Sequence, residues 1–96
     1  MYQDHNKLIG MILSEEEDLI ECHKQHVNEI INIEKEEMNL IAEVDKSGSD
    51  VEKYINSLDH MLVQKQSMIA QLRKKLMGFN AHLQMEKSLQ KLYNHK

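Results

Sequence analysis

The chain is 96 residues long, has a net charge of −4 and contains no proline, three glycines and one cysteine. This length allows one small domain, and so few turn-forming residues cannot build a β-sandwich or a barrel. A single cysteine excludes an internal disulfide scaffold and fits a reducing, cytoplasmic setting. The apolar runs are shorter than the roughly 18 residues that a membrane-spanning helix needs, and residues 1–14 lack the pattern of a signal peptide.

The composition of the chain predicts helices. Leucine, methionine, glutamate, glutamine and lysine dominate the composition, and these residues favour helices. Residues 1–14 come first, and their apolar stretch predicts a short segment or helix that packs on the ends of longer helices. Ser14 and Glu17 then form a capping-box pattern, which predicts that a long acidic helix starts there and covers about 15–44.

Residues 45–50 interrupt the helical pattern and predict a turn. Gly48 can adopt positive φ after a helix end, and Ser49 or Asp50 can cap the next helix. If Ser49 is the cap, Glu52 completes a second capping box. A turn this short places two helices side by side and antiparallel, so we expect an all-α hairpin that forms a single helical domain over 1–96.

Apolar residues recur every seven positions in the second long helix, which we expect over about 51–93. This pattern is typical of a helical bundle or a partly coiled-coil dimer. The second helix would be about 65 Å long and the first about 45 Å, so part of the apolar stripe needs another partner, and we expect a homodimer. The predicted partner or dimer interface consists of Ile55, Leu58, Leu62, Ile69, Leu72, Leu76, Phe79 and Leu83.

Charge divides between the two halves. Residues 1–48 carry four lysines and twelve acidic residues, a net −8, and residues 49–96 carry eight basic and four acidic residues, a net +4. The acidic helix should therefore attract the basic helix. The basic stretch after His60 also fits an acidic partner such as nucleic acid or the tubulin tails. The negative charge of the whole chain instead favours solvated residues or pairs with the first helix.

The sequence contains few candidates for metal ligands or catalytic residues. Cys22, His23 and His26 are the candidate metal ligands, because the two histidines are three positions apart on one helix. A closed zinc site needs four ligands, and no second cluster supplies the others. The chain also lacks a P-loop, a dinucleotide-binding glycine pattern and a nucleophile elbow. We therefore expect no catalytic residue, metal ligand or cofactor.

The turn and its flanks carry a family resemblance. The stretch from Glu36 to Ser49 resembles a segment near the C-terminus of the kinesin-13 proteins, and the resemblance extends over about Glu15 to Lys87. Ser47 stands where members of that family often have proline. The turn motif that carries the resemblance consists of Glu43, Val44, Asp45, Gly48 and Ser49.

The resemblance implies a parent protein that is an ATP-dependent, microtubule-depolymerising motor located at microtubules and the spindle. The motor domain, with its ATP and magnesium, is absent from this chain. The C-terminal helices of the family are implicated in dimerisation and in control of the motor. The resemblance thus implies a non-catalytic module whose partners are a second copy, the parent's motor domain and, through the parent, tubulin. Alternatives are a module that folds back on the motor or docks another partner, and a metal-binding or nucleic-acid-binding helical protein.

Overall fold

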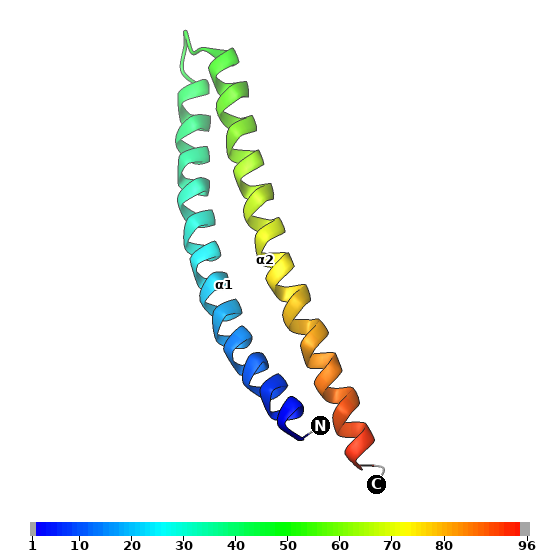
Figure 1. Cartoon of the computed structure of the whole chain (residues 1–96). Helices are drawn as coiled ribbons and strands as arrows, with labels where there is room; N and C mark the ends of the chain where they lie inside the picture. Colours follow the sequence, from blue (N-terminus) through cyan, green and yellow to red (C-terminus); the bar gives the residue numbers. More distant parts are fainter. Residues whose placement is uncertain (1, 95–96) are drawn as a thin grey trace. The chain divides into compact units, whose positions relative to one another are not determined.

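The computed structural model describes residues 2–94 of the chain. Met1, His95 and Lys96, at the ends of the predicted domain 1–96, lie outside the described residues. Helix α1 covers Tyr2–Val44 and helix α2 covers Val51–Asn94, and residues 45–50 connect them (Figure 1). Residues 2–94 contain no strand. The predictions of an all-α hairpin, of the turn and of the second helix are confirmed.

The start of α1 differs from the prediction. The helix begins at Tyr2 rather than near residue 15, so Ser14 lies inside it. Leu8 and Ile12 are both buried, and Leu19 continues their spacing. Burial of a leucine or isoleucine is worth about 1.5–3 kcal/mol, whereas an N-cap is worth about 1 kcal/mol. The apolar pattern therefore outweighs the capping box and extends the helix toward the N-terminus.

The chain divides into two compact units. The turn unit is Lys24–Ala70 and contains the connection between the helices. The terminal unit combines the chain up to His23 with the chain from Gln71 onward. Each unit pairs one part of α1 with one part of α2, and that the chain forms a single domain stays a prediction.

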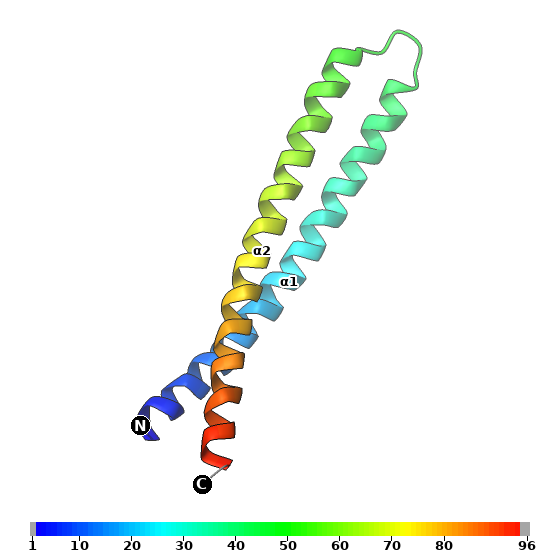
Figure 2. The same cartoon turned by 90° about the vertical axis from the view of Figure 1, so that its right-hand side faces the viewer.

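The turn unit is held by a seam between its two helix segments, which run side by side away from the turn (Figure 2). Ile33 and Leu40 are its buried residues, each 8% exposed. The other seam positions are half-buried and follow steps of three and four residues, which is the spacing of packed helices. They are His26, Ile30, Glu37 and Val44 on α1, and Tyr54, Leu58, Met61, Lys65 and Met68 on α2.

The terminal unit is built in the same way. Leu8 and Ile12 are its buried residues, each 8% exposed. The half-buried positions again follow helical spacing, but several of them are polar. They are His5, Glu15, Leu19 and Cys22 on α1, and Leu72, Phe79, His82, Leu83, Glu86 and Leu89 on α2.

The turn ends α1 with a glycine. Gly48 has a φ of +79°, as the sequence predicts, and this left-handed conformation is costly for residues with a Cβ atom. The backbone N–H of Asp45 donates to the carbonyl of Ile41 at 3.2 Å, and that of Ser49 donates to the carbonyl of Lys46 at 3.3 Å. These bonds satisfy backbone groups that a helix end leaves unpaired.

Asp50 caps α2. Its Oδ1 accepts hydrogen bonds from the backbone N–H groups of Glu52 at 3.0 Å and Lys53 at 3.2 Å. The alternative capping box built on Ser49 and Glu52 is wrong. The Ser49 hydroxyl instead donates to the carbonyl of Val44 at 2.8 Å, so it satisfies the end of α1 rather than the start of α2.

Candidate interaction surface

The turn unit contains an ion-pair cluster at its seam. Lys65 occupies a seam position of α2, and its side chain is 21% exposed. Its Nζ donates to Glu34 Oε1 at 2.7 Å and to Glu37 Oε2 at 2.9 Å. The hydrogen bond from Lys65 holds the pKa of Glu34 below its ordinary value, and the bonds to Glu34 and then Glu37 raise the pKa of Lys65. Glu34 and Lys65 are therefore charged at neutral pH, and the bonds from Lys65 to Glu34 and Glu37 tie the two helices together at one level.

The predicted interface residues separate into two groups. Leu58, Leu72 and Phe79 belong to one column with seven-residue spacing and are half-buried at the seam of their own unit. The other column is turned away from the seam, and only Leu83 in it is half-buried. Its remaining members are exposed, at 57% for Ile55, 50% for Leu62, 48% for Ile69 and 51% for Leu76.

The heptad pattern thus identified one seam column of α2 and missed the other. The missed column is made of larger or partly polar residues, so it gives a weaker apolar signal than the exposed column. It consists of Tyr54, Met61, Met68, His82 and Leu89.

Helix α1 also carries apolar residues outside the seam. In the turn unit, Val27 is 44% exposed, Ile31 46%, Met38 69% and Ile41 52%. They are spaced by four, seven and three residues, so they lie along one side of the helix. The exposed apolar side chains along this side of α1 and in the exposed column of α2 are the candidate interaction surface of the turn unit. They are Val27, Ile31, Met38, Ile41, Ile55, Leu62 and Ile69, and together they are called the apolar face below.

A second side of the turn unit is polar. A shallow hollow there is lined by Asn32 and Glu36 from α1 and by Gln64 and Ser67 from α2, with Ile33 and Met68 of the seam beside them. These polar side chains are exposed, and the hollow lies between the two helices. One side of the turn unit is therefore apolar, and another side is polar.

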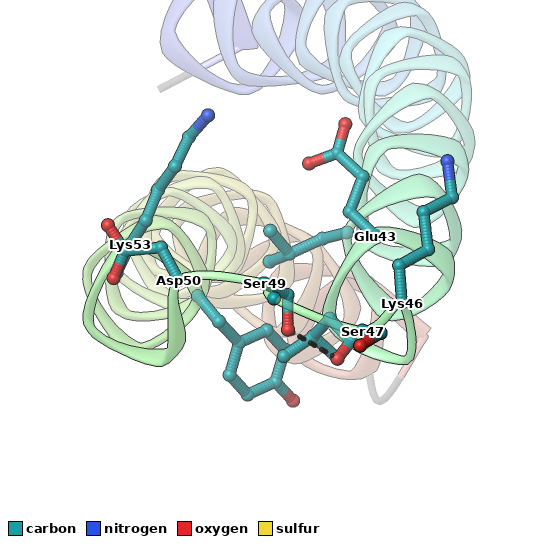
Figure 3. A pocket seen from close by; sticks show the side chains of 10 residues that line it. Glu43, Lys46, Ser47, Ser49, Asp50 and Lys53 are labelled. Carbon is teal, nitrogen blue, oxygen red and sulfur yellow. Dashed lines mark hydrogen bonds between the residues drawn. The ribbon is translucent and has the colours of Figure 1, made fainter.

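The residues of the turn motif surround a hollow at the end of the hairpin. Its lining includes Glu43 of α1, Lys46 and Asp50 of the connection, and Lys53 of α2 (Figure 3). Of the predicted motif, Glu43, Val44, Gly48 and Ser49 line the hollow. Ser49 and Gly48 also act in the turn itself, through the hydrogen bond to Val44 and the positive φ.

The polar residues of the terminal unit connect its helices. Lys75 Nζ donates to Asp18 Oδ2 at 2.6 Å, and this contact, with a smaller contribution from Cys22, raises the pKa of Lys75. His82 Nδ1 lies 2.8 Å from Glu15 Oε2. These pairs join the acidic helix to the basic helix, as the charge division predicts. Arg73 and Lys74, from the same basic stretch, are exposed.

The candidate metal ligands do not form a cluster. Cys22 and His26 are half-buried and His23 is exposed. Within the described chain, no group of three or more histidine, cysteine or acidic side chains is arranged to hold a metal ion.

Across residues 2–94, neither helix is apolar over enough of its length to span a membrane.

Comparisons with known proteins place the chain beside kinesins. Kinesin-like protein KIN-13B of Arabidopsis thaliana is 41% identical over 75 residues, which are 78% of this chain and 11% of that protein. Kinesin-like protein KIN-13A of Oryza sativa subsp. japonica is 37% identical over 81 residues, which are 84% of this chain and 10% of that protein. The chain thus spans about a tenth of the length of these relatives. No family model and no solved structure matches it.

A two-helix structure that matches kinesins over a tenth of their length defines a helical segment related to these proteins. The particular family is kinesin-13: the chain belongs to it and corresponds to one short region of its members. This confirms the resemblance that the turn motif indicates.

Proposed function

We propose that the chain is a non-catalytic dimerisation module of a microtubule-depolymerising kinesin. The observation that carries the proposal is the exposed column of α2, in which Ile55, Leu62, Ile69 and Leu76 repeat every seven residues and are about half exposed. A heptad column of aliphatic side chains in water is typical of a helix that packs against a further helix. Covering each of these side chains would contribute about 1 kcal/mol.

The small core of the hairpin supports the same proposal. Among residues 4–92, the four buried apolar side chains are Leu8, Ile12, Ile33 and Leu40, and each is still 8% exposed. Two helices with so little buried apolar surface gain stability when further helices cover them. In the parent protein, association would link two motor polypeptides. The ATP hydrolysis, the bound magnesium and the contact with microtubules of the cytoskeleton would belong to the motor domain of that parent.

The test is sedimentation equilibrium of the chain over a wide concentration range. We expect a mass of twice 11.3 kDa that persists on dilution. A stable monomer at every concentration would contradict dimerisation.

A second candidate function is regulation of the motor by the same hairpin. It is favoured by the charge of α1, which carries three lysines and eleven acidic residues, a net −8. Such a helix suits a basic docking surface on the parent's motor domain. The test is to add the chain to the separate motor domain and to measure microtubule-stimulated ATP turnover. No change in turnover at saturating concentration would rule out regulation in trans.

A further inference from the structure

We infer that the apolar face of the turn unit binds a second copy of this chain, with α1 of each copy packed on α2 of the other to form a four-helix bundle. The inference rests on the proposed self-association and specifies its surface and geometry. The apolar face consists of two stripes, one on each helix. The α1 stripe is Val27, Ile31, Met38 and Ile41, and the α2 stripe is Ile55, Leu62 and Ile69. The inference depends on where these stripes lie, on the charges around them and on the level at which the helices are joined.

The two exposed stripes lie on the same side of the turn unit. Successive residues of an α-helix are turned by about 100°. Counted in this way, the stripe of α1 and the stripe of α2 each lie about a quarter turn from the seam, in the same rotational sense. Because the helices are antiparallel, an equal rotation in the same sense brings both stripes to one side of the hairpin. The two stripes therefore form one continuous surface with two ridges.

The opposite side of the turn unit is polar, which supports this assignment. Asn32 and Glu36 of α1 share a hollow with Gln64 and Ser67 of α2. Counted from the seam, these four residues lie in the reverse rotational sense to the apolar stripes. The turn unit thus has an apolar side and a polar side, which is the arrangement of a hairpin that contributes half of a four-helix bundle.

The α1 part of the apolar face contains an acidic position, Glu34, and that position is already paired. Glu34 lies on the α1 stripe between Ile31 and Met38, and Lys65 donates to it from the seam at 2.7 Å. A carboxylate without a partner would oppose burial of this surface. The ion pair within the chain neutralises it, so a second copy can cover the face without leaving that charge unpaired.

The size of the apolar face suits a dimer. Its seven side chains are 44–69% exposed. Together they present roughly 600 Å² of apolar surface, close to the ~800 Å² that each partner of a stable dimer buries. Such a patch is at the upper end of what a monomer leaves exposed.

Charge selects how the second copy is oriented. Within the turn unit, the α1 segment 24–44 carries two basic and five acidic residues, a net −3, and the α2 segment 51–70 carries two basic and two acidic residues, a net charge of zero. A bundle that packs α1 on α1 of the second copy would place two acidic segments in contact. Packing α1 on α2 of the second copy places the acidic segment against a segment of zero net charge at both contacts, and so avoids this repulsion. The two-fold axis then runs along the helices, and the two turns lie at the same end.

This orientation gives defined pairs of facing residues. Lys65 bonds to both Glu34 and Glu37, so positions of α1 and α2 whose numbers add to about 100 lie at the same level. A two-fold axis along the helices preserves the level. Met38 of one copy therefore faces Leu62 of the other, and Ile31 faces Ile69.

The first test compares charge substitutions on the two sides of the turn unit. Leu62→Glu should raise the dissociation constant by about 100-fold or more in sedimentation equilibrium, because it places a second carboxylate in the covered surface. The matched control is Gln64→Glu on the polar side, which should leave the constant unchanged. Circular dichroism at high concentration checks that both variants stay helical.

The outcomes separate the inference from the proposed function. If the wild-type chain is a monomer, the proposed function and the inference both fail. If the wild-type chain is a dimer and Leu62→Glu dimerises equally well, the inference alone fails.

The second test reads the orientation directly and does not depend on the stability of a charged variant. In a Cys22→Ser background, chains carrying Met38→Cys are mixed with chains carrying Leu62→Cys and oxidised. We expect disulfide-linked pairs that contain one chain of each kind, since facing positions bring the Cα atoms within the roughly 7 Å that a disulfide allows. Pairs made mainly of two Met38→Cys chains would overturn the inference.

Discussion

Lys65 shows how one residue sets the alignment of the hairpin. It is a lysine at a seam position that would usually be apolar, and its Nζ reaches Glu34 and Glu37 at 2.7 and 2.9 Å. A slip of α2 along α1 would separate these charges and leave the half-buried Glu37 without its cation. Polar residues at seam positions often specify alignment in this way, at some cost in stability.

Replacement of Lys65 by methionine should therefore change the pH dependence of stability. The pKa of Glu34 is lowered in the folded state. Its ion pair therefore stabilises the folded state above pH 4.5, and this stabilisation is lost as the pH falls through the folded pKa. The pKa of Lys65 is raised in the folded state. Its ion pairs therefore stabilise the folded state below pH 10.5, and this stabilisation is lost as the pH rises through the folded pKa. Thermal unfolding followed by circular dichroism should give a lower midpoint for Lys65→Met between these limits.

The same series includes its control. The difference between wild type and Lys65→Met should shrink toward acidic pH, where the Glu34 carboxylate becomes protonated. Lys35→Met, at an exposed position of α1, should follow the wild-type curve. A difference that is constant across the whole pH range would contradict the role of the ion pairs.

At the scale of the elements, the connection 45–50 uses different residues for the two helix ends. Gly48 supplies the positive φ, Ser49 satisfies the carbonyl of Val44, and Asp50 caps α2. Each residue serves one helix end, so substitutions in the turn should have separable effects.

Asp50→Ala should destabilise the hairpin by about 1 kcal/mol, because two N–H groups at the start of α2 lose their acceptor. Urea unfolding measures this change in the free energy of unfolding. Ser47→Ala, at an exposed turn position, should change it much less. Equal losses for the two variants would show that Asp50 is not the cap.

Gly48→Ala and Gly78→Ala should have opposite effects. At Gly48, with a φ of +79°, alanine should cost about 1–2 kcal/mol. Gly78 lies inside α2, and a Cβ atom there would meet nothing within 4 Å, so alanine should stabilise the helix by up to about 1 kcal/mol. The same urea experiment compares them. A loss of stability in Gly78→Ala would show that another helix, such as one of a second copy, approaches that position closely.

At the scale of the whole molecule, exposed large apolar side chains outnumber buried ones among the described residues. The described residues bury four apolar side chains, whereas seventeen large apolar side chains are exposed by more than a third. A chain of this kind should be stabilised by association, because covering these side chains removes apolar surface from water.

The thermal midpoint should therefore depend on protein concentration. If folding and dimerisation are coupled, the midpoint should rise by several degrees for each tenfold increase in concentration, as mass action requires. Circular dichroism melts over a hundredfold range of concentration measure it, and Leu62→Glu should remove the dependence. A midpoint that is the same at all concentrations would indicate a hairpin that is stable as a monomer.

The sequence by itself determined the fold class, the turn and the family. Helix-forming residues, the absence of proline and the Gly48 region have local physical causes, so they can be predicted without tertiary contacts. The start of α1 does not have a purely local cause. Ser14 and Glu17 carry a helix-start pattern, but the burial of Leu8 and Ile12 against the other helix decides the boundary.

The tertiary structure alone decided which apolar column of each helix is covered. Helix α2 carries apolar residues in neighbouring columns, and a heptad pattern cannot tell Leu58, which is half-buried, from Leu62, which is 50% exposed. The choice depends on the rotation of one helix against the other. That rotation follows from all the seam contacts together, including the ion pairs of Lys65, and no single helix contains the information.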